Sequence, residues 1–124
     1  MPPLPPSPGS ATVLGQVAPA AATPTLLYTG PAALQVGSSG GATIAGIAFC
    51  ETNNAAAKVR ISIRVNGAAD AIAQYVLYDF ALAANGAGMW PQQPVFPTIG
   101  PGDLVYVQSD TGKVSFTLCG YANL

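Results

Sequence analysis

The chain has 124 residues, of which half are apolar and only 7% are charged, and its formal net charge is −1. Four lysines and arginines cannot form the basic surface that nucleic acid requires, so we expect no nucleic-acid partner. Histidine is absent, which removes the commonest general base and the imidazole metal ligand, so we expect no enzyme activity, metal or cofactor. So few charges favour a surface covered by copies of the chain or by a partner.

The first ten residues, MPPLPPSPGS, are predicted to be a proline-rich arm ahead of one domain, residues 11–124. Proline fixes φ and lacks a donor, so we expect an extended segment that reaches about 30 Å. Two interpretations are open: a solvated tail, or an arm that docks on a partner. We favour docking because a stiff segment loses less entropy on binding. The candidate partner-binding residues of the arm are Pro2, Pro3, Leu4, Pro5, Pro6 and Pro8.

Targeting signals are not found in the sequence. The N-terminus has no positive region and no long apolar region, so we predict no signal peptide. No uninterrupted apolar run reaches 18 residues, so we expect no membrane partner. Synthesis in a reducing compartment would then keep Cys50 and Cys119 reduced, with a disulfide between them as the less favoured alternative.

After residue 10, apolar residues recur with the period of β-strands. Short strands are predicted within TPTLLYTG, ALQVG and ATIAGIAFC, which are residues 23–30, 33–37 and 42–50. Gly46 inside the third segment indicates a bulge or a close backbone approach. Strand alternation turns both cysteines away from the core, where each would be a small apolar residue at a subunit contact.

The clearest alternation is AKVRISIRV, residues 57–65, which ends at an Asn66-Gly67 turn. Its apolar face consists of Val59, Ile61, Ile63 and Val65. Its other face carries three of the four cations, namely Lys58, Arg60 and Arg64. In the next segment, residues 73–82, one face is predicted to hold Val76, Tyr78, Phe80 and Leu82, and the other Tyr75, Leu77 and Asp79. We expect Asp79 to pair with Arg60 or Arg64 across strands rather than to act as a buried acid.

A turn at Asn85-Gly86 precedes MWPQQPVFPTIGPG, residues 89–102, whose four prolines exclude a central strand. We predict a rigid surface loop with Trp90, Phe96 and Ile99 as candidate partner-binding residues. The alternative is that these side chains fold back and cap one end of the domain.

The chain closes with a predicted hairpin, in which DLVYVQ and KVSFTLCG flank a turn at residues 109–112. Val114, Phe116 and Leu118 should face the core. Asp70, Asp103 and Asp110 occupy turns or a strand start, where aspartate is commonly structural. Seven or eight short strands and no capped helix predict an all-β fold, an antiparallel β-sandwich or jelly-roll-like domain.

Four segments, in order, resemble parts of small tailed-bacteriophage virion proteins. VLGQVAPAAATPTLLYTGPA resembles the opening of their domain, and IAFCETNNAAAKVRISIRVNG resembles the pair of strands that follows. YVLYDFALAANG resembles their Tyr-Asp strand and Ala-Asn turn, and IGPGDLVYVQSDTGKVSFTLCGY their closing hairpin. The resemblance covers nearly all of residues 13–121, but the arm and the proline-rich loop depart from the pattern.

This resemblance implies a non-enzymatic virion structural protein with a β-sandwich fold. It would be a capsid decoration (cement) protein, a homotrimer on the capsid surface of the virion, assembled in the host cytoplasm. It would stabilise the head by binding the lattice of the phage major capsid protein. One alternative is a tail or baseplate receptor-binding knob that touches host polysaccharide through the loop at residues 90–99. Another is an adhesive or carbohydrate-binding module unrelated to phage.

Overall fold

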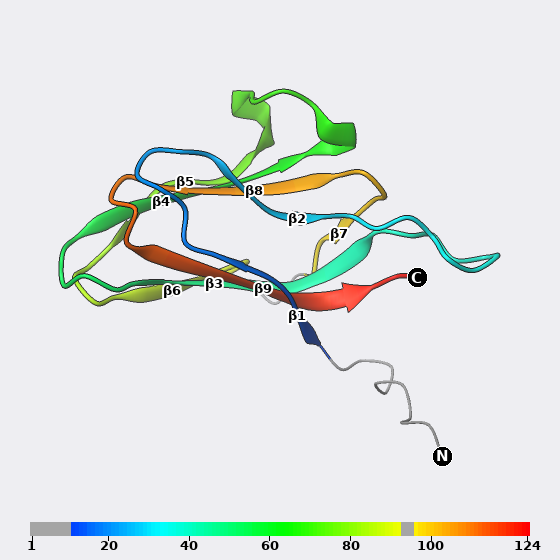
Figure 1. Ribbon diagram of the computed structural model, residues 1–124, viewed down its shortest axis with the longest axis horizontal. Coiled ribbons are helices and arrows are strands. Elements are labelled where there is room, and N and C mark those ends of the chain that lie inside the picture. Colours follow the sequence, from blue (N-terminus) through cyan, green and yellow to red (C-terminus); the bar gives the residue numbers. More distant parts are fainter. Residues whose placement is uncertain (1–10, 93–95) are drawn as a thin grey trace, which may run out of the picture.

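The computed structural model describes residues 11–92 and 96–124, which form an all-β sandwich of two antiparallel sheets, as predicted (Figure 1). The predicted arm lies outside the described residues. The strands are β1 (Thr12–Val17), β2 (Thr25–Thr29), β3 (Ala42–Glu51), β4 (Ala57–Arg64), β5 (Tyr75–Leu82), β6 (Ala87–Trp90), β7 (Thr98–Ile99), β8 (Leu104–Ser109) and β9 (Val114–Ala122). Two single-turn 3₁₀ helices, η1 (Val65–Gly67) and η2 (Ile72–Gln74), connect β4 to β5.

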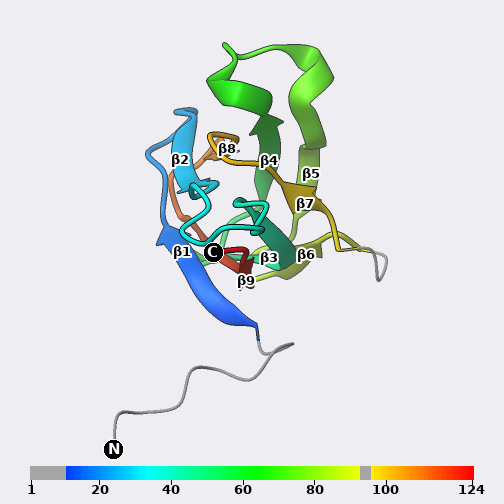
Figure 2. The ribbon, with the colours of Figure 1, turned by 90° about the vertical axis from the view of Figure 1, so that its right-hand side faces the viewer.

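The strand order is that of a jelly roll. One sheet runs β1-β9-β3-β6, with the short β7 also paired to β3, and the other runs β2-β8-β4-β5. Leaving β7 aside, the first strand pairs with the last, the second with the next to last, the third with β6, and β4 with β5. This nested pairing wraps the chain into two layers, which Figure 2 shows from the end of the molecule.

The core fills the space between the layers. Phe49 of β3 contacts Phe116 of β9, and it also contacts Phe80 of the opposite sheet with the two ring centres 5.7 Å apart. The predicted core residues Val114, Phe116 and Leu118 are at most 1% exposed, and Val59 and Ile61 are fully buried, which confirms these inward positions. The inward position predicted for Val65 is wrong, because β4 ends at Arg64 and Val65 is 59% exposed at the start of η1. The bulge predicted at Gly46 is also confirmed, because the β3–β9 register shifts between Ile44 and Gly46.

The predicted closing hairpin is wrong. Strand β8 pairs with β2 and β4, whereas β9 pairs with β1 and β3 in the other sheet. The turn after Ser109 therefore crosses from one layer to the other. A turn signature indicates that the chain reverses, but it carries no information about whether the next strand joins the same sheet.

The strand predicted at residues 33–37 is also wrong, because this segment forms a turn that projects from one end of the sandwich. Leu34 and Val36 are 75% and 108% exposed, so the apolar residues of this alternating segment are not buried against any other part of the domain. Leu34 and Gln35 instead donate their backbone N–H groups to the carbonyl of Leu124. Strands β1, β6 and β7 were not predicted.

The predicted faces of β5 hold only for its second half. Phe80 packs against the core and Leu82 is buried, but Leu77 also packs inward while Val76 and Tyr78 are exposed. The register shifts between these halves: Val59 pairs with Phe80, yet Ile61 pairs with Leu77. Asp79 has φ of +51°, so β5 contains one extra residue and its alternation reverses there.

Candidate functional site

The predicted contact loop folds back at both ends. Trp90 pairs with Ile47 in the sheet and packs against the core, and Ile99 pairs with Ala42 and is only 3% exposed. Ile99 is therefore a core residue with no surface to offer a partner, in line with the alternative that the loop caps the domain. Phe96 is 59% exposed. Partner binding by Trp90 and Phe96 stays a prediction, and the candidate residues of the arm lie outside the described part of the chain.

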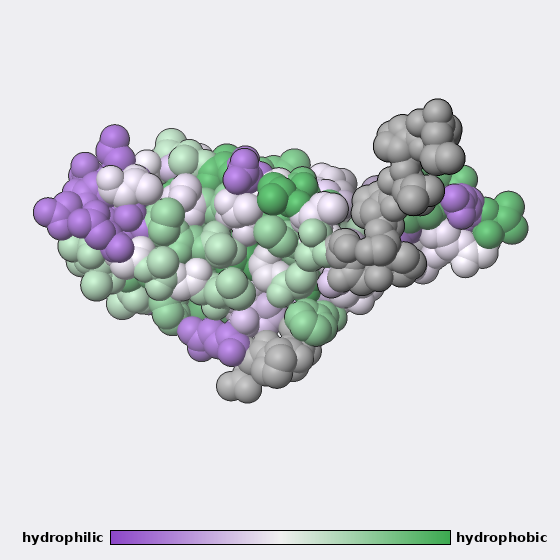
Figure 3. Space-filling view, turned by 90° about the horizontal axis from the view of Figure 1, so that it is seen from below, coloured by the Kyte–Doolittle hydropathy of each residue, from purple (hydrophilic) through white to green (hydrophobic). Residues whose placement is uncertain are grey.

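The outer face of the β1-β9-β3-β6 sheet carries no charged side chain among the described residues. Figure 3 views this face, where apolar and small residues cover most of the surface and polar ones gather toward its margins. Of the charged residues nearest to it, Glu51 is buried at the end of β3, and Lys113 lies in the turn before β9. We call this surface the neutral face.

A shallow hollow of about 450 Å³ lies on the neutral face. Its lining residues come from three neighbouring strands and include Ala48, Cys50, Ala87, Met89, Ser115 and Thr117. The hollow exists because most of these side chains are small, while Met89 stands 53% exposed beside them. Small side chains allow a partner surface to approach the sheet closely, and few polar groups would have to be desolvated when it does.

Both cysteines are free, so the disulfide alternative is not realised. Each is partly buried, on adjacent strands, but Cys50 pairs with Ser115 and Cys119 pairs with Gly46, so the two are offset along the sheet. The sulfur of Cys50 lies 3.1 Å from the hydroxyl oxygen of Ser115.

The opposite outer face, on the β2-β8-β4-β5 sheet, has a different chemistry. The bulge at Asp79 turns Tyr78 and Asp79 to the same side of β5, where both contact Arg60 of β4. The Nε of Arg60 donates to Oδ1 of Asp79 over 2.6 Å, and the guanidinium carbon lies 4.1 Å from the centre of the Tyr78 ring. This confirms the predicted cross-strand pair. Hydrogen bonding to Arg60 lowers the pKa of Asp79, and the same bond raises the pKa of Arg60.

Arg64 repeats part of this arrangement four residues further along β4, on the same face of the strand. Its guanidinium carbon lies 3.8 Å from the centre of the Tyr106 ring, and Nη2 is 3.7 Å from Oδ1 of Asp70. The Arg64 side chain is 13% exposed, compared with 29% for Arg60. Arginine over a tyrosine ring is a stabilising cation–π contact, so both cations of this row are held in place.

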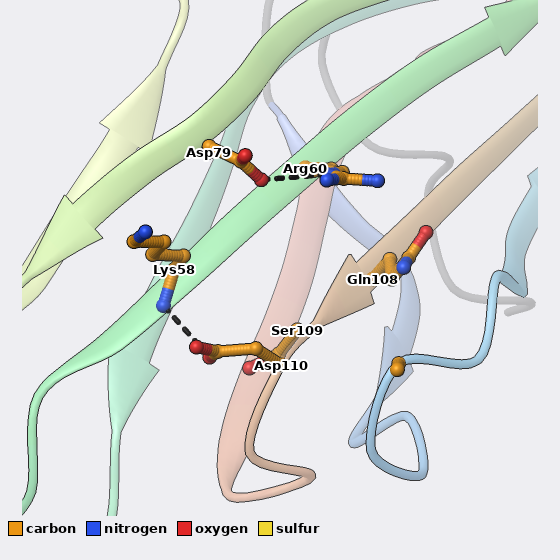
Figure 4. A pocket seen from close by; sticks show the side chains of 7 residues that line it. Lys58, Arg60, Asp79, Gln108, Ser109 and Asp110 are labelled. Carbon is orange, nitrogen blue, oxygen red and sulfur yellow. Dashed lines mark hydrogen bonds and ion pairs between the residues drawn. The ribbon is translucent and has the colours of Figure 1, made fainter.

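A cleft of about 290 Å³ opens beside the Arg60–Asp79 pair. It is lined by Ala22, Lys58, Arg60, Asp79, Gln108, Ser109 and Asp110 (Figure 4). Asp110 accepts a hydrogen bond from the backbone N–H of Lys58 over 2.9 Å, which joins the turn after β8 to β4. Sequence reasoning missed Gln108, because only the β4–β8 pairing places it opposite Arg60.

Two other carboxylates hold loops. Asp103 accepts backbone N–H groups of Gly100 and Asn66, which confirms its predicted structural role. Glu51 accepts those of Asn53, Ala55 and Asn85, and so joins the β3–β4 loop to the β5–β6 turn. Burial opposes ionisation of Glu51, but these donated hydrogen bonds outweigh it and lower its pKa.

Within residues 11–92 and 96–124, no three histidine, cysteine or acidic side chains gather into a set that could hold a metal ion. In the same part of the chain, no helix has the length and apolarity to cross a membrane. No protein-family model matches the sequence, and a search of curated proteins also finds no match.

Proposed function

We propose that the protein is a non-enzymatic virion structural protein, a capsid decoration protein whose copies associate through the neutral face. The observation that supports this most is the segregation of charge, since among residues 11–92 and 96–124 one outer face of the sandwich has no charged side chain. A face without charges associates at little desolvation cost, and the hollow around Ala48 admits a close-fitting partner surface. The proposal takes the phage context from the sequence resemblance.

In this proposal a homotrimer sits on the capsid surface, and the arm at residues 1–10 binds the major capsid protein. The trimer presents three such arms, so contacts that are weak singly add up through their high effective concentration. Binding only to the assembled lattice stabilises the head by mass action. Proline in the arm lowers the conformational entropy lost when it docks.

Incorporation onto decoration-free particles tests the proposal. The full chain is added to such particles, and copies per particle are counted after sedimentation. We expect hundreds of copies for the full chain and a large loss when residues 1–10 are deleted. A few to tens of copies on native virions, located at the tail, would instead indicate a receptor-binding role.

A thermal melt of the deletion variant is the control for folding. The described strands begin at Thr12, so we expect an unchanged melting temperature and an unchanged oligomer. If the deletion variant loads as well as the full chain, the arm does not attach the protein. If it loses its oligomeric state, the arm belongs to the subunit contacts instead.

A further inference from the structure

The cleft beside Arg60 contains hydrogen-bonding groups that the fold does not use. Nε of Arg60 is committed to Asp79, but its two terminal nitrogens make no hydrogen bond with any described residue. The side-chain amide of Gln108 makes none either within the described chain. The β4–β8 register pairs Arg60 with Gln108, and Figure 4 shows their polar ends on the same side of the sheet.

The guanidinium group of Arg60 is held in position before any ligand arrives. Arg60 is fixed on one side by the carboxylate of Asp79 and on another by the ring of Tyr78. Both contacts depend on the bulge at Asp79, which presents two successive residues of β5 on the outer face. An arginine that is already immobilised loses little side-chain entropy on binding, so its free N–H groups are suited to recognition.

The charges of the cleft restrict the class of ligand. Two cations, Lys58 and Arg60, are matched by two carboxylates, Asp79 and Asp110, so the formal charges of the lining cancel. An anion gains no net attraction there. The groups not used in hydrogen bonds within the described chain are instead a mixture of donors and acceptors. The terminal nitrogens of Arg60 donate, the second oxygen of Asp79 accepts, and the amide of Gln108 can do both.

We infer that this cleft binds an uncharged saccharide through two neighbouring ring hydroxyls. A hydroxyl both donates and accepts, so one pair can accept from the terminal N–H groups of Arg60 and donate to Asp79 or to the carbonyl of Gln108. The volume of about 290 Å³ lies at the small end of the range for ligand sites, which suits a single sugar ring. This inference concerns a site away from the proline-rich loop, and it does not depend on the virion proposal.

The test uses the ¹⁵N-labelled full chain and nuclear magnetic resonance titration with four probes. Three are uncharged methyl glycosides, of mannose, galactose and rhamnose, and the fourth is glucuronate. We expect at least one uncharged glycoside to shift the side-chain signals of Arg60 Nε–H and Gln108 in a saturable manner. Because no net charge is involved, the affinity should change less than twofold between low and moderate salt.

Two arginines of β4 supply a matched pair of test and control substitutions. Arg60→Lys keeps the charge but removes the paired terminal N–H groups, and Gln108→Ala removes the amide, so each should weaken binding by about tenfold. Arg64→Lys makes the same chemical change on the same face, at a residue that also stacks on a tyrosine but does not line the cleft. It should leave the affinity unchanged.

Three results would overturn the inference. The first is no saturable shift with any uncharged glycoside. The second is equal weakening by Arg60→Lys and Arg64→Lys. The third is binding of glucuronate alone with strong salt dependence, which would assign the cleft to carboxylates. All three concern the isolated protein, so they leave the particle-loading result of the virion proposal unaffected.

Discussion

The two outer faces of the sandwich share one core and differ in almost everything else. The neutral face consists mostly of small and apolar side chains, with polar but uncharged ones such as Gln16 among them, whereas the face formed by β4 and β5 carries a row of cations. Two of those cations are held between a carboxylate and a tyrosine ring. Residues that point inward from both sheets form the one core, so the core determines the fold and the outward residues determine what each face contacts.

The contrast indicates that one face stays hydrated and that the other is suited to association. Arg60 and Arg64 of β4 remain partly exposed and paired, so that face stays hydrated and is suited to small polar ligands. The neutral face has nothing comparable to keep a neighbour away, and in a chain with only 7% charged residues it is the natural surface for self-association.

The core beneath both faces is where the largest loss of stability is expected. Phe116→Ala removes a ring that is 1% exposed and contacts Phe49, so it should lower the free energy of unfolding by about 3–5 kcal/mol. Thr117→Ala is the matched control, because its side chain is on the neutral face of the same strand. It should cost less than about 1 kcal/mol. Denaturant unfolding followed by circular dichroism measures both, and similar costs would contradict the division into inner and outer faces.

Acid should lower the stability of the fold through the carboxylates whose pKa is lowered by folding. Glu51 and Asp79 both have lowered pKa values, so the unfolded chain binds more protons than the folded one just below the ordinary carboxyl pKa, about 4. Their contribution is therefore complete above that pH and is lost as the pH falls through the folded pKa values.

Melting curves between neutral and acid pH test the role of Glu51 directly. Glu51→Gln should melt at a lower temperature than the wild type at pH 7, because an amide accepts less strongly from three backbone N–H groups. The difference should shrink as the pH falls. A difference that grows on acidification would mean that the sign of the pKa shift is wrong.

A smaller effect is expected from the ion pairs of the charged face. A double-mutant cycle of Arg60→Ala with Asp79→Ala should show favourable coupling, because their 2.6 Å hydrogen bond is charge-assisted. The same cycle on Arg64 and Asp70, 3.7 Å apart, should show weaker coupling. Unfolding midpoints of the single and double variants provide the measurement. Equal coupling in the two cycles would contradict the stronger interaction assigned here to Arg60 and Asp79.

Period-two alternation was enough to predict the sandwich and the inward residues of β4 and β9, because Val59, Ile61 and Phe116 lie in regular strands. It failed in β5, where Asp79 adopts a positive φ. A glycine at that position would have indicated the irregularity, but the residue is an aspartate. It failed again at residues 33–37, where an alternating sequence has no second layer to pack against.

For the candidate site, the cross-strand pair of Arg60 and Asp79 could be predicted because β4 and β5 are consecutive in the chain. Gln108 could not, since β8 reaches β4 only after the chain has crossed to the other sheet and back. The burial of Ile99 could be given only as one of two alternatives, because its pairing with Ala42 joins segments far apart in sequence.

The molar mass of two glutamate variants in solution tests most directly whether the neutral face mediates association. Ala48 and Ala81 are both exposed strand residues, but Ala48 lies on the neutral face and Ala81 on the charged face, opposite Lys58. Light scattering should show a trimer for the wild type and for Ala81→Glu, and a monomer for Ala48→Glu, because that carboxylate would be buried unpaired. A wild-type monomer, or an Ala48→Glu protein with the wild-type mass, would contradict association through this face.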